Sequence, residues 1–166
     1  ISAYHDGRCL DIAGARIVQK RCDNPSPQQL WVVRELTGTY VQIVNNVSGK
    51  CLALKNNFAV QEACDEKDDQ VWNAKRTGNT FSLVAKQTNL CLEVRDQSRK
   101  DGAAIQQARC TDASNQKWTI ESLRKNDFER LYQADKKQMP KGIPVFDWLE
   151  TGSDDYPIAV TVDESR

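Results

Sequence analysis

Apolar and polar residues alternate with a period near two over most of residues 1–122. This alternation is typical of short β-strands that bury one face, because neighbouring side chains in a strand point to opposite sides. Gly, Asn, Asp and Ser separate the runs, as expected for tight turns. The clearest predicted strands are Tyr40–Val44, Cys51–Leu54, Phe81–Val84 and Trp118–Ile120. Short strands at regular spacing predict an all-β barrel or sandwich.

The pattern occurs three times along the chain. Each copy opens with Cys-Leu, continues through a turn region to a second Cys and closes with Gln-x-Trp. The copies are CLDI…C…QLW, CLAL…C…QVW and CLEV…C…QKW, and they open at Cys9, Cys51 and Cys91. A period of about 40 residues indicates a repeat architecture, and three repeats of about four strands predict roughly twelve strands. The repeats cover about residues 1–39, 40–79 and 80–122.

The alternation also predicts a core. Each repeat has a pair of aliphatic residues that we expect to face inward, and these are Leu10 and Ile12, Leu52 and Leu54, and Leu92 and Val94. The residue between each pair belongs to the opposite face, so Asp11 and Glu93 are expected to point outward near a loop. The recurring Trp31, Trp72 and Trp118 are expected to pack in the core about a pseudo-threefold axis.

The six cysteines fall into three pairs, one inside each repeat. The repeat selects the pairings Cys9–Cys22, Cys51–Cys64 and Cys91–Cys110. Paired cysteines also bind zinc, but a zinc site favours CxxC spacing or nearby histidines, and the chain has one histidine. Disulfides are the favoured prediction, and they indicate an oxidising, extracellular location for a secreted protein.

Composition excludes some classes of partner. The chain has 166 residues with 23 basic and 23 acidic side chains, so its formal net charge is zero. Without a basic stripe, nucleic acid is not an expected partner. No apolar stretch approaches the roughly 18 residues that cross a bilayer, so no membrane span is expected. We expect no metal site and no cofactor.

Residues 123–166 break the pattern. We expect them to form a C-terminal extension of mixed or irregular structure that packs on residues 1–122 or on a partner domain. Asn126–Gln138 has the capping residues of a helix, while Val145–Leu149 and Tyr156–Val162 have the composition of strands or extended chain. The first repeat also has few apolar residues before its opening Cys, which suggests that strand residues lie upstream in a larger protein.

The three Cys-Leu and Gln-x-Trp motifs in register with three Cys pairs resemble the ricin B-chain lectin family over about 122 residues. The resemblance implies a β-trefoil in which each repeat has room for one shallow sugar site. In this family an acidic residue just after Cys-Leu accepts hydrogen bonds from sugar hydroxyls. An aromatic residue two positions before the second Cys stacks on the sugar, with a polar residue four positions before that Cys and an amide pair at Gln-x-Trp.

Mapping that site onto the chain gives incomplete matches. The third repeat keeps Glu93, Gln106, Asn115 and Gln116 but has Ala108 at the aromatic position. The first repeat keeps three residues, Asp11, Gln28 and Gln29, and has Val18 and Lys20 at the polar and aromatic positions. The second repeat has Ala53 for the acid and Glu62 for the aromatic, so we expect it to be inactive.

Two interpretations of these residues remain open. They bind sugar, or the Gln-x-Trp glutamines tie loops to the backbone and Asp11 caps a turn. Aromatic residues elsewhere are candidates for the missing stacking side chain, without support from their position in the repeat, and these are Tyr4, Phe58 and Trp148.

The resemblance implies a carbohydrate-binding module that targets a secreted protein, such as a toxin or an extracellular enzyme, to cell-surface or polysaccharide glycans. Galactose- or N-acetylgalactosamine-type glycans are the expected partners, together with other domains of a larger parent protein. The alternative is a degenerate trefoil that serves as a protein–protein interaction or structural module. Catalysis is not expected, because the only histidine, His5, lies beside Asp6 in a turn and neither GxSxG nor HExxH occurs.

Overall fold

The computed structural model describes residues 1–22, 26–120, 122–124 and 155–157. Within these residues, twelve strands form one sheet, and they divide evenly among the three repeats. Those of the first repeat are β1 (Ser2–Ala3), β2 (Cys9–Ala13), β3 (Arg16–Lys20) and β4 (Trp31–Glu35). Those of the second are β5 (Tyr40–Asn45), β6 (Cys51–Lys55), β7 (Phe58–Glu62) and β8 (Trp72–Thr77). Those of the third are β9 (Thr80–Ala85), β10 (Cys91–Val94), β11 (Ile105–Ala108) and β12 (Trp118–Thr119). The predicted all-β architecture is confirmed.

In the described part of the chain, four short 3₁₀ helices complete the repeats. Three of them end at the glutamine of Gln-x-Trp, namely η1 (Pro27–Gln29), η2 (Asp68–Gln70) and η4 (Ser114–Gln116), while η3 (Arg95–Gln97) follows β10. Each of η1, η2 and η4 is followed by the strand that begins at the tryptophan of the motif. The recurring motif therefore marks one repeated turn that leads into a buried strand.

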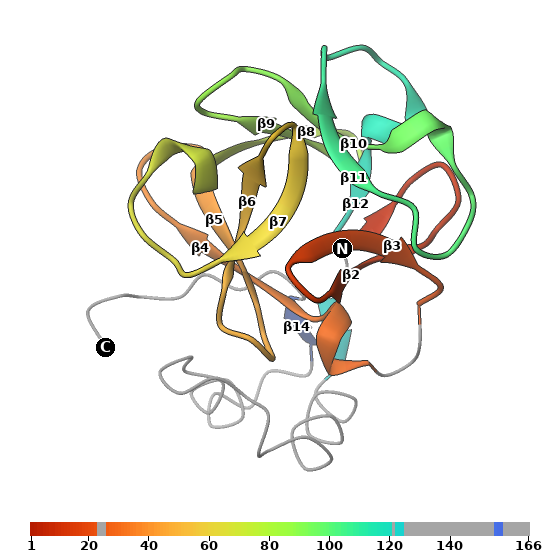
Figure 1. Cartoon of the computed structure of the whole chain (residues 1–166), viewed down its shortest axis with the longest axis horizontal. Helices are drawn as coiled ribbons and strands as arrows, with labels where there is room; N and C mark the ends of the chain where they lie inside the picture. The colour runs from red at the N-terminus through yellow and green to blue at the C-terminus, as the bar shows by residue number, and fades with distance from the viewer. Residues whose placement is uncertain (23–25, 121, 125–154, 158–166) are drawn as a thin grey trace.

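The strands form two sets with different roles (Figure 1). The first and last strand of every repeat pair with one another in the order β1-β12-β9-β8-β5-β4. The middle two strands of every repeat form a hairpin, so β2 pairs β3, β6 pairs β7 and β10 pairs β11. The three hairpins surround a common centre in the figure, in red, yellow and green. This is the β-trefoil arrangement with three pseudo-threefold repeats that the resemblance implies.

The core confirms the predicted threefold packing. Trp31, Trp72 and Trp118 are each fully buried. Each indole N–H donates to the backbone carbonyl of a buried leucine in its own repeat, at 3.1 Å to Leu10, 3.0 Å to Leu52 and 3.0 Å to Leu92. A buried indole needs such an acceptor, because an unsatisfied donor in an apolar core is costly. Of the predicted aliphatic pairs, Ile12 alone is only partly buried.

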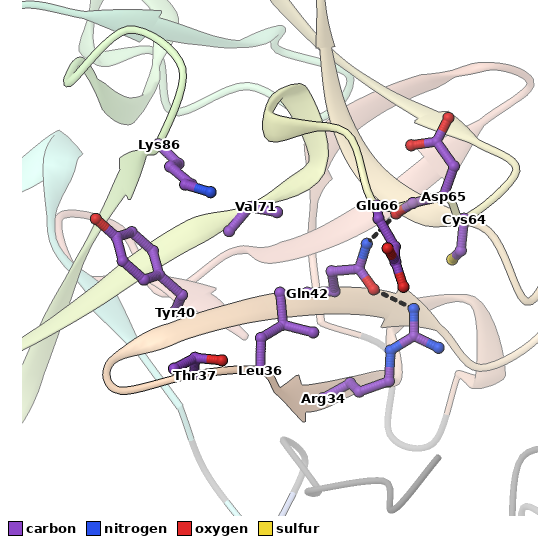
Figure 2. A pocket seen from close by; sticks show the side chains of 10 residues that line it. All are labelled: Arg34, Leu36, Thr37, Tyr40, Gln42, Cys64, Asp65, Glu66, Val71 and Lys86. Carbon is purple, nitrogen blue, oxygen red and sulfur yellow. Dashed lines mark hydrogen bonds between the residues drawn. The ribbon is translucent and has the colours of Figure 1, made fainter. Parts of the chain in front are cut away.

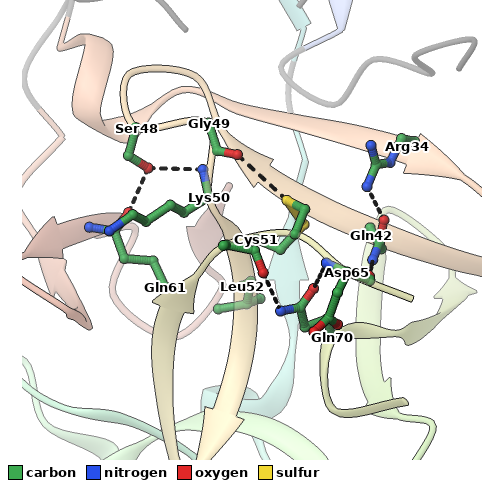
Figure 3. The surroundings of a disulfide bond; sticks show 12 residues. Arg34, Gln42, Ser48, Gly49, Lys50, Cys51, Leu52, Gln61, Asp65 and Gln70 are labelled. Atoms are coloured by element: carbon green, nitrogen blue, oxygen red, sulfur yellow. Dashed lines mark hydrogen bonds between the residues drawn. A yellow bond between two sulfur atoms is a disulfide. The ribbon is translucent and has the colours of Figure 1, made fainter. Parts of the chain in front are cut away.

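The three disulfides have the predicted pairings, Cys9–Cys22, Cys51–Cys64 and Cys91–Cys110. Each closes a loop inside one repeat, with sequence separations of 13, 13 and 19 residues. Near the second disulfide, Gln70 accepts a hydrogen bond from the backbone N–H of Asp65 at 2.8 Å (Figure 3). The disulfide and the Gln-x-Trp glutamine therefore fix the same loop from two sides.

The hairpins also pair with one another, which closes a ring at one end of the barrel. Arg16 of β3 pairs with Val60 of β7, and Phe58 of β7 pairs with Gln106 of β11. An isolated bridge between Val18 and Ala104 joins the third hairpin to the first. Residues from different repeats are therefore brought into register by pairings that cross repeat boundaries.

The turn before β7 explains where Phe58 lies. Asn56 and Asn57 connect β6 to β7 and have φ angles of 48° and 72°. Two residues with positive φ suit a two-residue hairpin turn, and asparagine tolerates this conformation better than most residues. The tight turn places Phe58 at the start of β7, opposite Lys55.

The described part of the extension is one strand pair. Ser122–Arg124 (β13) pairs in antiparallel fashion with Asp155–Pro157 (β14). The predicted helix at Asn126–Gln138 and the predicted segment Val145–Leu149 lie outside the described residues. Of the range Tyr156–Val162, only residues 156 and 157 are described, and both belong to β14.

Candidate functional site

In the third repeat, the structure brings together the four residues that the sequence predicts. Glu93 on β10 is half-buried and accepts hydrogen bonds on both carboxylate oxygens. The side-chain amide of Gln106, directly across the hairpin, donates to Oε1 at 2.9 Å. On the other side, the amides of η4 donate to Oε2, from Asn115 at 3.4 Å and from Gln116 at 3.0 Å.

The two η4 amides also bind backbone carbonyls, so their positions are fixed. Asn115 Nδ2 donates to the carbonyl of Val94 at 2.9 Å. Gln116 Nε2 donates to the carbonyl of Arg109 at 2.8 Å, and Gln116 Oε1 accepts the backbone N–H of Thr111 at 2.7 Å. Both side chains are buried. The two buried η4 amides therefore hold Glu93 in a fixed position. Gln106, on the neighbouring strand, is partly exposed.

A lone-pair count shows what this carboxylate can still accept. An ionised carboxylate has about four lone-pair sites. Three amide donors contact Glu93, which leaves about one site for a ligand hydroxyl unless Gln106 swings away. Hydrogen bonds to an ionised acceptor are stronger than neutral ones, so a single remaining site is useful for recognition.

The first repeat has the acid of the family site, but its side chain is buried. Asp11 is only 6% exposed, so the face on which we expected it is covered by neighbouring residues rather than open to solvent. Its Oδ2 accepts the amide of Gln29 at 3.0 Å, and its Oδ1 accepts the backbone N–H of Ile12 at 2.6 Å. The shorter aspartate side chain stays close to the backbone and contacts Gln29 of η1.

The structure does not bring Gln28 to Asp11 by any described contact. Its side-chain oxygen accepts the hydroxyl of Ser26 at 3.1 Å, and its backbone carbonyl accepts the side-chain amide of Asn45 at 2.8 Å. In the described contacts, Gln28 thus links the turn before β4 to the end of β5.

The second repeat has no acid at the equivalent position, where Ala53 is fully buried. Glu62, which stands at the family's aromatic position, lies 3.3 Å from the ammonium of Lys55 across the hairpin. This pair is exposed, so it contributes little to stability.

The three Gln-x-Trp glutamines have a common structural contact. Each side-chain amide donates to a backbone carbonyl near the second Cys of its repeat, at 2.9 Å from Gln29 to Arg21, 2.8 Å from Gln70 to Ala63 and 2.8 Å from Gln116 to Arg109. The loop-tying interpretation therefore holds in all three repeats. In the first and third repeats, the same amide also reaches the acid.

Comparison with known proteins agrees with this architecture. The family described as ricin-type β-trefoil lectin domain matches residues 1–72, and the family described as ricin-type β-trefoil lectin domain-like matches residues 68–138. The chain is a ricin B-like β-trefoil. Because both families are described as lectin domains, the match supports a carbohydrate-binding module. A comparison with curated protein sequences gave no significant match.

Solved structures show the same fold. The designed threefold-symmetric protein ThreeFoil is 27% identical with a TM-score of 0.67, and the match covers 71% of this chain and 93% of that one. An exo-β-1,3-galactanase from Clostridium thermocellum is 27% identical with a TM-score of 0.66, and the match covers 71% of this chain but 28% of that one. A ricin B-like lectin from Macrolepiota procera, solved with lactose, is 18% identical with a TM-score of 0.62 over 71% and 89%, which shows the fold alone.

A concave site on this ricin B-like trefoil was not predicted from the sequence. A cavity of about 440 Å³ lies between the β4–β5 hairpin and the loop that follows the second disulfide (Figure 2). Tyr40, Leu36 and Val71 give it an apolar side, and Asp65, Glu66 and Arg34 give it a charged side. Its lining comes from segments far apart in the chain, so no sequence motif reveals it.

Two of the charged side chains that line this cavity are paired with neighbouring residues. The ammonium of Lys86 lies 2.8 Å from Asp68 and 5.5 Å from the centre of the Tyr40 ring. The hydrogen bond to Asp68 raises the pKa of Lys86. Contacts with Lys67 lower the pKa of Asp65.

The three candidate stacking aromatics have different outcomes. Tyr4 is 58% exposed on the loop after β1, and Trp148 lies outside the described residues. Phe58 is half-buried and pairs with Gln106 of the third-repeat site. The sequence gives Phe58 no positional support, because its relation to Gln106 depends on pairing between strands of different repeats.

Proposed function

We propose that this chain is a carbohydrate-binding module whose main sugar site is in the third repeat. The observation that carries the proposal is the half-buried carboxylate of Glu93, surrounded by the amides of Gln106, Asn115 and Gln116. Glu93 offers its remaining lone pair as an acceptor, and the partly exposed Gln106 side chain has a second amide N–H to donate, as the hydroxyls of a sugar require.

Galactose- or N-acetylgalactosamine-type glycans are the proposed ligands. The match at 27% identity to an enzyme named an exo-β-1,3-galactanase supports this class. One shallow polar site binds weakly, so useful affinity depends on several sites acting together or on several copies of the chain.

We place the protein outside the cell and assign the module a targeting role. Three disulfides are typical of secreted proteins. None of the helices in the described part of the chain has the length and apolarity that crossing a bilayer requires. The matching part of the galactanase is 28% of that chain. By analogy, the chain directs a larger secreted protein, such as a toxin or an extracellular enzyme, to cell-surface or polysaccharide glycans.

A glycan array with galactose- and N-acetylgalactosamine-terminated ligands, followed by calorimetry, tests the site. Glu93→Gln keeps the side-chain shape and removes the charge. We expect it to weaken binding by about tenfold, the loss expected for one hydrogen bond to an ionised group. Glu62→Gln, in the second repeat, is the matched control and should bind like the wild type. Equal binding by wild type and Glu93→Gln would exclude Glu93 as a sugar ligand.

The alternative is a trefoil that binds a protein partner. One observation favours it, namely that Asp11 is sealed and Ala53 replaces the acid, so two of the three sites offer no open carboxylate. A blank array from a folded and multivalently displayed chain would favour this alternative over a lectin.

A further inference from the structure

The strand register extends the third-repeat site into the second repeat. Glu93 pairs with Gln106 across the β10–β11 hairpin, and Gln106 pairs with Phe58 across β11 and β7. Residues that pair directly in antiparallel strands project from the same face of the sheet. Glu93, Gln106 and Phe58 therefore form one row on one face, with about 10 Å between the outer strands of the row.

The equivalent rows of the other repeats have different chemistry. In the first repeat the row is Asp11, Val18 and Ala104, and in the second repeat it is Ala53, Val60 and Arg16. Of these three described rows, the third alone combines an acid, an amide and an aromatic ring. The third repeat therefore differs from the other two in the side chains of this row, which lie outside the Gln-x-Trp motif.

Two guanidinium groups lie over the Phe58 ring. The Arg16 guanidinium carbon is 5.8 Å from the ring centre, and that of Arg95 is 5.7 Å away. Arg16 is exposed at the start of β3, and the Arg95 side chain is 52% exposed on η3. Arg95 Nε also lies 3.6 Å from the carboxylate of Asp96, which is 85% exposed. Both cations therefore face solvent, and the ring restricts where their planar heads can lie.

We propose that Phe58, Arg16 and Arg95 form a second subsite for an acidic sugar residue, carrying a carboxylate or a sulfate, next to the sugar bound at Glu93. This inference rests on the proposed function, because Glu93 anchors the neutral residue of the same glycan. The planar fork of arginine matches carboxylate and sulfate oxygens. The guanidinium carbons of Arg16 and Arg95 lie 5.8 Å and 5.7 Å from the centre of the same ring.

The charges at the two ends of the row set the direction of the glycan. The carboxylate of Glu93 repels an acidic sugar, whereas Arg16 and Arg95 attract it. The neutral residue is therefore placed over Glu93 and Gln106, and the acidic residue beside Arg16 and Arg95. A glycan with the opposite order of residues would bring like charges together at Glu93.

The test compares three ligands on the full chain by calorimetry at low and at high salt. These are a neutral β-galacto-oligosaccharide, the same oligosaccharide with a hexuronic acid residue and the same oligosaccharide with a sulfate. We expect the acidic ligands to bind about tenfold more tightly at low salt, and salt to reduce this advantage because exposed charges are screened. A preference for one acidic ligand over the other identifies carboxylate or sulfate as the recognised group.

Variants then locate the subsite. Arg16→Gln combined with Arg95→Gln should remove the advantage of the acidic ligands and leave neutral binding unchanged. Arg76→Gln is the matched control, because the Arg76 guanidinium carbon lies 6.0 Å from the centre of the Phe81 ring, elsewhere on the sheet. This variant should change neither the binding of the neutral ligand nor the advantage of the acidic ligands. Phe58→Leu should reduce the acidic advantage at an unchanged melting temperature.

The outcomes separate this inference from the proposed function. If the neutral ligand binds through Glu93 and acidic ligands bind no more tightly, the subsite is wrong and the lectin site stands. An acidic advantage that persists in the double arginine variant also overturns the subsite. If neither neutral nor acidic ligands bind the wild type, the proposed function fails and the subsite fails with it.

Discussion

The second and third repeats have the same backbone plan but opposite site chemistry. Both contain a disulfide, a buried indole that donates to a leucine carbonyl, and a glutamine that accepts the backbone N–H of the residue after the second Cys. At the position after Cys-Leu, however, the second repeat has the fully buried Ala53 and the third has the half-buried Glu93. The contacts that hold the trefoil together are therefore separate from the groups that would bind a ligand.

This separation has a physical reason. The buried tryptophans and leucines fill a shared core, where a change in volume is costly in any repeat. The residue after Cys-Leu lies on the other face of its strand, where an acid or an alanine fits the same backbone. One repeat can therefore lose its site without losing its fold, and the variants below test that difference.

The largest expected effect is a loss of stability when a tryptophan of the core shared by the repeats is removed. Trp72→Ala should lower the free energy of unfolding by about 3–5 kcal/mol, because it empties a fully buried position and leaves the carbonyl of Leu52 without its donor. Trp118→Ala should cost a similar amount. Denaturant unfolding under non-reducing conditions measures both, with Leu36→Ala, at an exposed position, as the control. A wild-type midpoint for Trp72→Ala would contradict the common core.

A smaller loss of stability, without a loss of glycan binding, should distinguish the acid of the first repeat from that of the third. Asp11→Ala should lower the free energy of unfolding by about 1–3 kcal/mol, because it removes the acceptor of Gln29 and of the Ile12 N–H in a buried position. Glycan affinity should not change, since the carboxylate is sealed. Asp112→Ala, at an exposed acid, is the control. Lost glycan binding with wild-type stability would show that Asp11 is a ligand residue after all.

The smallest effect concerns the loop after the second Cys. The pKa of Asp65 lies below its ordinary value of 3.8, first because the Lys67 backbone N–H donates to it at 2.9 Å and then because the Lys67 ammonium lies 3.0 Å away. Lys67→Ala removes the ammonium and keeps the backbone donor. The pKa should rise only part of the way towards 3.8, as measured by an NMR titration of the Asp65 carboxyl.

The sign of the associated pH effect follows from the lowered pKa. Asp65 stabilises the fold above its unfolded pKa, and this contribution disappears as the pH falls through the lower folded pKa. Both groups are exposed, so the change in stability should be close to zero. At the equivalent place in the third repeat, Thr111 makes the same backbone hydrogen bond to its glutamine without an ionisable group. A clear loss of stability in Lys67→Ala would show that this surface pair matters more than its exposure implies.

The sequence by itself determined the repeat architecture. The spacing of Cys-Leu, the second Cys and Gln-x-Trp predicted the three repeats, the disulfide pairings and the buried tryptophans, because these features follow from local alternation and from a period that recurs along the chain. The resemblance to the ricin B-chain lectin family, mapped onto the sequence, also grouped Glu93, Gln106, Asn115 and Gln116 as one candidate site. All four lie within one repeat, so their proximity depends on one hairpin and one turn.

Tertiary structure alone decided the burial of Asp11 and the position of Phe58. Asp11 and Glu93 occupy the same place in their motifs, but Asp11 is buried and Glu93 is half-buried, and burial depends on what packs around a residue rather than on its place in a motif. Phe58 meets Gln106 through the pairing of β7 with β11. Such a pairing joins strands of different repeats, and its register is set by the closure of the whole barrel.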